Sequence, residues 1–394
     1  MKALNVIAFA FAFAFAFAAQ GALYMDAPKV QARAEILWTR PICVETNRYI
    51  GWPTVCRLKN GDILVVFSGD RDEHVCPYGK VQMVRSSDGG ETWSVPDTIA
   101  STVLDDRDAG IVQMPDGEVI VTWFTSTAYR RPDIFKVRPD FRRHDEKIDK
   151  QAAKAAFGNF LIHSRDNGKT WMKMEKLSNY AQTPHGPILL KDGSLLEIGR
   201  TGKGKVKDKL GRELPARTII TVSKSTDAGR TWTVLCPEIP DENGENDKPA
   251  MFHEPHVAEL ADGTLVGLVR YHGPDNCMRV TFSHDGGRTW SPMTKTPMVG
   301  YPPHLLVLPD GKLVNVYGRR LADPGFGEFA CISDDDGRTW DTPNEIILAP
   351  SDNGDLGYPS STLLADGSIL TVYYQKPAPR QKPCLMATKW RVLR

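Results

Sequence analysis

The sequence predicts an all-β fold, a six-bladed β-propeller built from four-stranded antiparallel blades. Two repeats carry this prediction. The pattern Ser-x-Asp-x-Gly-x-Thr-Trp occurs five times, and an Asp-Gly or Asn-Gly dipeptide between two apolar runs occurs six times. The Asp residues of successive Ser-x-Asp patterns are 78, 61, 58 and 50 residues apart. Such spacing is typical of one supersecondary unit repeated along a chain.

Each Ser-x-Asp pattern, called an Asp box below, predicts a tight turn. Its Asp can bond the backbone of the turn, its Gly tolerates a positive φ, and its Trp is expected to pack between neighbouring units. The five boxes span residues 86–93, 164–171, 225–232, 283–290 and 333–340.

The Asp-Gly and Asn-Gly dipeptides predict six two-residue hairpins. Five hairpins are followed by a third strand and then an Asp box, so each unit is a meander of four strands and six units make a propeller. The last hairpin is followed by a third strand over 385–392 but by no box. We therefore expect the segment near 34–39 to supply the outer strand of that blade. The six hairpin glycines are Gly61, Gly117, Gly193, Gly263, Gly311 and Gly367.

Composition limits the location and the partners of the protein. Residues 1–22 contain Lys2 and then an apolar Ala/Phe run, which predicts a signal peptide, a propeller domain over 23–394, and a secreted or periplasmic protein. A net charge of +1 gives no indication of nucleic acid, and no later segment predicts a membrane span. The seven cysteines lack Cys-x-x-Cys spacing and His pairs, so we expect no metal and no cofactor, and one disulfide stays open.

The repeat phase also predicts where a site lies. In a meander, the first strand of each blade lines the channel, and the Asp boxes occupy the face opposite to the second-strand ends. Loops and strand ends on a rigid scaffold carry function. Counting back nine residues from each hairpin glycine gives the channel-mouth positions Trp52, Asp108, Pro184, Glu254, Pro302 and Tyr358. Counting forward seven or eight gives the second-strand ends, where Arg200, Arg270 and Arg319 occur, with Arg320 competing with Arg319.

Purely structural roles are the alternative for each of these residues. Tyr358 could line the channel, Glu254 could be a solvated rim carboxylate, and Arg270 and Arg319 could form ion pairs. Three histidines could form hydrogen bonds at strand ends: His185, His256 and His304. Four consecutive residues could form a loop of ion pairs among themselves: Asp105, Asp106, Arg107 and Asp108. A shared repeat phase favours a site, because independent surface residues have no reason to share one.

In these motifs the chain resembles the sialidase (neuraminidase) superfamily of Asp-box propellers. The resemblance implies a Tyr nucleophile, a Glu that activates it, an Asp acid/base and three arginines that hold a substrate carboxylate. Glu254 in EPHVAELADGTLVGLVR is similar to the family Glu, and Arg270 to the second arginine. Tyr358 in GYPSS is similar to the nucleophile, and Arg319 (or Arg320) to the third arginine.

Two departures from the family pattern stand out. The first-blade Arg-Ile-Pro motif is replaced by Gly51-Trp52-Pro53, so Arg71 or Arg48 is a candidate replacement for its arginine. The loop that carries the acid/base Asp in the family is HVCPYGK here and has none. Asp108, or a residue of 70–74 such as Asp72, is then the candidate acid/base. The predicted substrate-binding set is Arg270, Arg319, Arg200, Arg71, Arg107, Trp52, His185 and His256.

The resemblance implies an exo-glycosidase that hydrolyses a terminal acidic sugar, a sialic acid or a related ulosonic or uronic acid, with a glycan as partner. Two alternatives stay open. One is a glycosidase or polysaccharide lyase on another acidic glycan, with His185 or His256 and a Tyr as the acid/base pair. The other is a non-catalytic glycan-binding propeller. The long basic segments 128–157, with a helix expected over 146–157, and 201–217 agree with a carbohydrate pocket.

Overall fold

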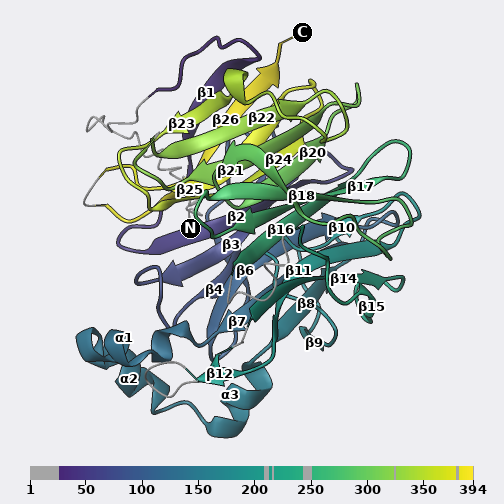
Figure 1. The fold of residues 1–394 in the computed structure, drawn as a ribbon. Helices are drawn as coiled ribbons and strands as arrows, with labels where there is room; N and C mark the ends of the chain where they lie inside the picture. Colours follow the sequence, from purple (N-terminus) through teal and green to yellow (C-terminus); the bar gives the residue numbers. More distant parts are fainter. Residues whose placement is uncertain are drawn as a thin grey trace, which may run out of the picture.

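The computed structural model describes residues 26–207, 213–214, 217–242, 251–323, 325–378 and 381–393. In this part of the chain, six four-stranded antiparallel sheets form the blades of a propeller (Figure 1). The predicted all-β fold is therefore confirmed. The predicted signal peptide over 1–22 and part of the 201–217 segment lie outside the described residues.

Each blade is the predicted meander, from an inner strand at the channel to an outer strand. The first blade has β2 (Tyr49–Arg57), β3 (Ile63–Arg71), β4 (Lys80–Ser86) and β5 (Asp97–Ala100). The second has β6 (Asp105–Gln113), β7 (Val119–Ser126), β8 (Asn159–Ser164) and β9 (Glu175–Leu177). The third has β10 (Ile188–Leu189), β11 (Leu195–Lys203), β14 (Arg217–Ser225) and β15 (Thr233–Cys236), with β12 (Val206–Lys207) and β13 (Glu213–Leu214) as a separate two-stranded extension.

The remaining blades repeat the order. The fourth has β16 (Phe252–Glu259), β17 (Leu265–Tyr271), β18 (Cys277–Ser283) and β19 (Thr294–Val299). The fifth has β20 (Pro303–Val307), β21 (Leu313–Arg319), β22 (Gly327–Ser333) and β23 (Ile346–Pro350), with a 3-10 helix, η3 (Thr342–Asn344), before β23. The sixth has β24 (Leu356–Leu363), β25 (Ile369–Gln375), β26 (Cys384–Val392) and β1 (Ala34–Cys43).

The N-terminal strand closes the ring, as predicted. β1 pairs antiparallel with β26 from Ala34 opposite Val392 to Cys43 opposite Leu385. The strand runs past the expected 34–39 segment to Cys43. The sixth blade therefore combines β1 from the N-terminal end with β24, β25 and β26 from the C-terminal end in one sheet. This sheet has four strands, like the other blades, and it joins the two ends of the chain.

The Asp boxes are structural turns. In the box at 164–171, Gly168 N donates to Ser164 Oγ at 2.8 Å, and Thr170 donates its N–H and hydroxyl to Asp166 at 2.8 and 2.6 Å. The same bonds recur in the other four boxes. Trp171 packs on the apolar cluster that joins the first two blades, as predicted for the box tryptophans.

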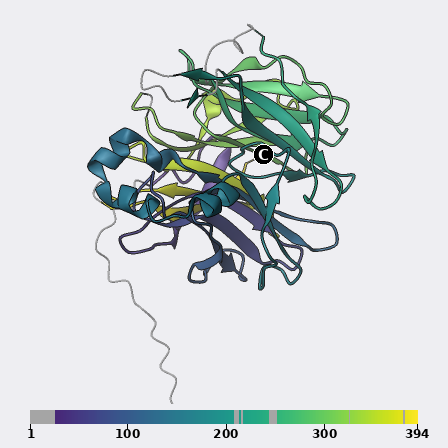
Figure 2. The same cartoon turned by 90° about the horizontal axis from the view of Figure 1, so that it is seen from below.

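The 128–157 insertion between β7 and β8 is more helical than predicted. It contains η1 (Ala128–Arg130), α1 (Pro132–Val137), α2 (Pro139–Asp145) and α3 (Lys150–Ala156), which cluster at one rim of the molecule (Figures 1 and 2). The predicted helix over 146–157 is present as α3, and it starts where Asp149 accepts a hydrogen bond from Ala152 N at 2.8 Å. The helices α1 and α2 were not predicted because six or seven residues are too few to show an apolar periodicity; each begins at a proline.

All seven cysteines lie in described residues and are free thiols, six of them buried. The disulfide left open by the sequence is not formed. Among the described residues, no helix has both the length and the apolar character needed to cross a membrane.

Candidate active site

Four channel-mouth residues share an unusual backbone conformation. Trp52, Asp108, Glu254 and Tyr358 have φ angles of 57°, 49°, 38° and 55°. Each lies at a shift in the pairing register of an inner strand, which is the mark of a β-bulge. Bulges turn a side chain out of the alternation of its strand, and non-glycine residues with positive φ concentrate at functional sites. Four of the six channel-mouth positions found by counting from the hairpin glycines therefore share one conformation, a β-bulge with a positive φ.

These four side chains line a single cavity of about 480 Å³ at the channel mouth. Its size is within the range of small-molecule sites. The ionisable residues that line it with them are His74, Arg107, Arg200, Arg270 and Arg320. The rest of the wall consists of Phe124, Thr125, Ser126, Thr127, Ala128, Phe157 and Gln182.

Tyr358 and Glu254 are in hydrogen-bond contact. The Tyr358 hydroxyl donates to Glu254 Oε1 at 2.5 Å, and Arg270 forms an ion pair with Glu254 Oε2. Burial alone would raise the pKa of Glu254, but the charge of Arg270 and the hydrogen bonds from Tyr358 and Arg270 lower it to about 2. Burial and the charge of Glu254 raise the pKa of Tyr358 well above its usual value. The pair is a neutral phenol against an ionised carboxylate.

Asp108 has the opposite electrostatic environment. Its carboxyl is buried, and its Oδ1 has no hydrogen-bond partner in the described residues. Burial raises the pKa of Asp108 to about 7; Arg107 lowers it and Glu254 raises it further. Asp108 can thus hold a proton near neutral pH in the same cavity in which Glu254 stays ionised, an arrangement that separates an acid from a base.

Arginines from four blades reach the cavity. Arg200 donates to Gln182 Oε1 at 2.7 Å and lies 2.7 Å from His253 Nδ1. Arg270 donates through Nε to His272 Nε2 at 2.7 Å. Arg320 donates to the Leu356 carbonyl at 2.6 Å and to the Tyr374 hydroxyl. Arg107 is the fourth. These contacts orient the planar guanidinium groups, which suit a carboxylate ligand because they bind it bidentately.

The structure places Arg320, and not Arg319, in the cavity. Arg319 donates to Glu345 at 2.5 Å and lies over the ring of Phe329, 4.0 Å from its centroid. The sequence-based preference for Arg319 was therefore wrong, and the alternation of side chains along the strand explains why. Arg200 and Arg270 stand seven residues after their hairpin glycines, and Arg320 stands nine after Gly311, which is the same parity. Arg319, at eight, points to the opposite side of its strand.

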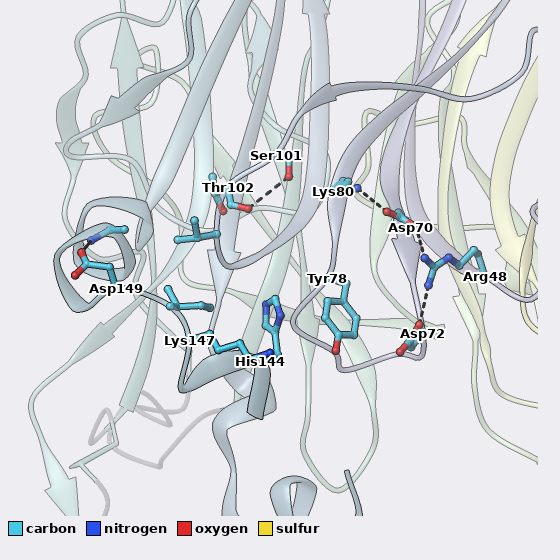
Figure 3. A pocket seen from close by; sticks show the side chains of 13 residues that line it. Arg48, Asp70, Asp72, Tyr78, Lys80, Ser101, Thr102, His144, Lys147 and Asp149 are labelled. Carbon is cyan, nitrogen blue, oxygen red and sulfur yellow. Dashed lines mark hydrogen bonds and ion pairs between the residues drawn. The ribbon is translucent and has the colours of Figure 1, made fainter. Parts of the chain in front are cut away.

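Arg71 and Asp72 also lie outside the cavity lining, so the structure does not support the predicted roles of Arg71 in substrate binding and of Asp72 as the acid/base. Arg71 is fully buried and forms an ion pair with Asp105. Its guanidinium packs over the Trp52 ring, 4.9 Å from the ring centroid. Asp72 is held by Arg48 at 2.7 Å and by Arg138 at 3.0 Å, and it lines a separate groove (Figure 3). Arg48 lines the same groove, so neither candidate for the missing arginine reaches the cavity.

Trp52 is in the cavity wall, whereas the predicted histidines lie deeper in the channel. The guanidinium of Arg107 lies 4.4 Å above the Trp52 ring. His185 and His256 are buried; His185 lies edge to face with His304 at a ring separation of 5.0 Å, and His256 stacks on His304 at 4.3 Å. His256 Nδ1 accepts a hydrogen bond from Leu305 N at 3.0 Å. These histidines bond at strand ends, the structural alternative considered for them.

Several wall residues were not singled out from the sequence. Phe124 and Thr125 stand seven and eight residues after Gly117, so the count that found the arginines also indicates them, although neither is ionisable. Gln182 pairs with Arg200 through two backbone hydrogen bonds of 3.0 and 2.8 Å. His74 and Phe157 come from long loops, for which the repeat phase gives no signal.

Comparison with known proteins relates the chain to one family and to one sialidase. A family model described as a BNR repeat-like domain matches residues 134–372. A Clostridium perfringens sialidase is 25% identical over 278 residues, which cover 65% of this chain and 64% of that protein, so the chain spans somewhat less than two thirds of that relative.

Solved structures share the fold. A protein of unknown function from Dyadobacter fermentans has a TM-score of 0.72 and 24% identity, with 91% of this chain and 99% of that chain covered. The NanB sialidase of Streptococcus pneumoniae has a TM-score of 0.62 and 15% identity, with 91% and 70% covered. Trypanosoma rangeli sialidase in complex with sialic acid has a TM-score of 0.56 and 15% identity, with 92% and 58% covered.

Proposed function

Because this chain belongs to the BNR repeat-like domain family and is a sialidase-like propeller, we propose that it is a secreted or periplasmic exo-glycosidase that hydrolyses a terminal acidic sugar from a glycan. The observation that carries the proposal is the contact of Tyr358 with Glu254 at 2.5 Å, beside Arg270. A buried phenol hydrogen-bonded to an ionised carboxylate has the arrangement of an activated nucleophile.

The cationic lining supports an acidic substrate. Four arginines line the cavity, and only two carboxyl groups line it with them, those of Glu254 and Asp108. Because the pKa of Asp108 is about 7, its carboxyl group is neutral in acidic solution. The four arginines are Arg107, Arg200, Arg270 and Arg320. A sugar carboxylate would therefore replace water at a site with excess positive charge. We assign the clamp to Arg200, Arg270 and Arg320, which come from adjacent blades.

The proposed first step is transfer of the sugar to Tyr358. Glu254 takes the phenolic proton as the tyrosine oxygen attacks the anomeric carbon, and Asp108 gives its proton to the departing glycosidic oxygen. A neutral nucleophile suits an anomeric carbon that bears a carboxylate, because a carboxylate nucleophile would be repelled by it. Sialidases are known exceptions to the two-carboxylate scheme of glycosidases for this use of Tyr.

The proposed second step returns the enzyme to its starting state. The Asp108 carboxylate takes a proton from water, whose oxygen attacks the anomeric carbon while the bond to Tyr358 breaks. Glu254 gives the proton back to the phenolate oxygen. Two displacements retain the anomeric configuration.

The test is turnover of aryl glycosides of sialic, other ulosonic and uronic acids, with the first-formed anomer observed by NMR. We expect release of one acidic sugar with retained configuration. Full activity in Tyr358→Phe would overturn the mechanism. The lyase alternative has less support, since it needs His185 or His256, which lie outside the cavity lining; an ultraviolet-absorbing unsaturated product would favour it. Binding without turnover across the panel would favour the non-catalytic alternative.

A further inference from the structure

His74 is held in one orientation at the wall of the cavity. Its side chain lines the cavity and reaches solvent there. Its carbonyl oxygen accepts hydrogen bonds from Arg71 Nη2 at 3.1 Å and from Arg107 Nη2 at 3.2 Å. Its ring lies edge to face with Trp52, at a centroid separation of 5.0 Å. A residue fixed in this way is preorganised for contact with a ligand.

Two hydrogen bonds behind the cavity set the tautomer of His74. Tyr49 is buried, and its hydroxyl donates to Asp355 Oδ1 at 2.6 Å. Asp355 also forms an ion pair with Lys376 at 2.9 Å, and a carboxylate in an ion pair accepts hydrogen bonds but donates none. This contact uses the single proton of the Tyr49 hydroxyl. The Tyr49 oxygen, 2.9 Å from His74 Nδ1, must therefore accept a hydrogen bond from Nδ1–H.

The second ring nitrogen of His74 is consequently an acceptor. A neutral imidazole with its proton on Nδ1 has a lone pair on Nε2. The Nδ1 edge of the ring faces buried Tyr49, which leaves the Nε2 edge for the cavity, and Nε2 has no hydrogen-bond partner among the described residues. Enclosure by the cavity walls and the positive charges of Arg107 and Arg320 lower the pKa of His74 to about 3. The ring therefore stays neutral, and Nε2 stays an acceptor, in neutral and mildly acidic solution.

Most other polar groups of the cavity wall donate hydrogen bonds or are already bonded. The four arginines can only donate. Glu254 accepts hydrogen bonds from Tyr358 and Arg270. Gln182 Oε1 accepts one from Arg200. A sugar hydroxyl that donates toward this wall would find the imidazole lone pair, whereas a sugar carboxylate would be repelled by that lone pair and attracted to the arginines.

From these observations we infer that His74 determines specificity within the cavity by accepting a hydrogen bond at Nε2 from one hydroxyl group of the bound acidic sugar, with Tyr49 as the positioning residue that keeps its tautomer. This inference rests on the proposed function. Loss of the oxygen, or an acetyl ester on it, removes the donor and leaves Nε2 unpaired. The cavity therefore selects the sugar in which this hydroxyl is free and rejects its deoxy and O-acetyl derivatives.

The kinetic experiment combines changes in the protein with changes in the sugar. The substrates are the phenyl glycoside of the acidic sugar that is turned over and derivatives that each lack one hydroxyl, so the leaving group has no hydroxyl of its own. His74→Phe keeps a ring and removes the acceptor, whereas His74→Gln offers an amide oxygen near the position of Nε2. We expect His74→Phe to lower kcat/KM about tenfold for the parent sugar, to have no effect on the derivative that lacks the contacted hydroxyl, and His74→Gln to restore part of the loss. An equal loss on every derivative, or no loss on any, overturns the inference.

Matched variants separate the role of the tautomer from a general structural effect. Tyr49→Phe should show the same dependence on one hydroxyl as His74→Phe. The control for it is Tyr373→Phe, which loses a buried hydroxyl 2.9 Å from Thr388 Oγ1. The control for the imidazole is His284→Phe, at an exposed position of an Asp box. Both controls should leave kcat/KM unchanged, and a loss in them as large as that in Tyr49→Phe and His74→Phe overturns the inference.

The tautomer is observed by nitrogen NMR of protein labelled at its histidines, with the His74 signals assigned by their absence from His74→Gln. We expect the proton on Nδ1 in the wild type and a mixture of tautomers in Tyr49→Phe. A proton on Nε2 of the wild-type residue overturns the inference, because that nitrogen would then donate and not accept.

A binding measurement separates this inference from the proposed function. N-acetylneuraminic acid, ketodeoxyoctulosonic acid and glucuronic acid are titrated calorimetrically into the wild-type protein and into His74→Phe. Weaker binding by the variant of a sugar that the wild type binds supports the role of His74 even where no glycoside is hydrolysed, a result that would refute only the catalytic proposal. Equal binding by the two proteins, or binding of none of these sugars, overturns the inference.

Discussion

Asp108, which is buried, and Glu254, whose side chain is 21% exposed, are carboxyl groups in one cavity, and their pKa values are shifted in opposite directions. Burial raises the pKa of Asp108 to about 7, whereas Arg270 and two hydrogen bonds outweigh burial at Glu254 and lower its pKa to about 2. The difference arises from position. Glu254 lies between a guanidinium and a phenol, while Asp108 Oδ1 has no partner among the described residues. One carboxyl group is thus prepared as an acid and the other as a base.

The first prediction concerns pH. The active form has Asp108 protonated and Glu254 ionised, so kcat/KM should be constant in mildly acidic solution and fall as the pH rises through about 7. Glu254, with its pKa of about 2, gives no loss until strongly acidic pH. The measurement is kcat/KM for an aryl glycoside from pH 4 to 9. Activity that increases steadily above pH 7 would contradict the assignment of Asp108 as the acid.

Asp108→Asn should remove the alkaline limb together with most of the activity. General acid catalysis contributes about 10²–10⁴-fold, and the loss should be smaller for glycosides with acidic phenol leaving groups, which need no proton. The checks are kcat/KM for a series of aryl leaving groups and the pH profile of the variant. A loss that is independent of the leaving group would mean that Asp108 acts in another way.

Tyr358→Phe removes the nucleophile and leaves the ring that packs at 6.2 Å from Trp52 and Tyr374. We expect turnover to fall by at least about a thousandfold with little change in the affinity for the acidic sugar, because the arginines remain. Tyr373→Phe is the matched control: it loses a buried hydroxyl that lies 2.9 Å from Thr388 Oγ1, away from the cavity. Activity and binding are measured in parallel, and a control variant as inactive as Tyr358→Phe would argue for a folding defect.

The adjacent pair Arg319 and Arg320 offers an internal comparison. Arg320→Ala should raise KM for an acidic sugar about ten- to a hundredfold, the loss of one charge-assisted contact. Arg319→Ala should leave KM unchanged and lower the stability by about 1–3 kcal/mol, because it leaves Glu345 without its ion-pair partner. Kinetics and urea denaturation of both variants distinguish the two roles; the reverse pattern would restore Arg319 to the clamp.

The repeats predicted the fold and part of the site for a physical reason. A propeller uses one meander six times, so the distance from a hairpin glycine to the channel mouth is nearly constant, and Trp52, Asp108, Glu254 and Tyr358 were found by counting. The count at the second-strand ends allowed two neighbouring positions and did not apply alternation, so Arg319 was preferred to Arg320.

The remaining residues of the site depend on features that have no repeat. His74 and Phe157 lie in loops of individual length, and the fate of Arg71 and Asp72 was decided by ion pairs with Asp105, Arg48 and Arg138, which come from distant segments. The composition of a loop indicates its charge but gives no partner for each charged group. The predicted signal peptide stays a prediction.

The last prediction is that the active site reduces stability and that Asp108→Asn restores some of it. The folded-state pKa of Asp108, about 7, is above its ordinary value of 3.8. Between these values the folded protein binds more protons than the unfolded chain, so this group lowers the stability as the pH rises through that window. Asparagine is neutral throughout and tolerates the positive φ of 49° at this position.

The variant should therefore melt at a higher temperature than the wild type at pH 8 and show a smaller difference at pH 5, where Asp108 is already protonated. Thermal denaturation at the two pH values is the measurement. Asp97→Asn, at an exposed position of β5, controls for the general effect of removing a carboxylate. The same difference in melting temperature at both pH values would mean that the buried charge of Asp108 does not limit stability.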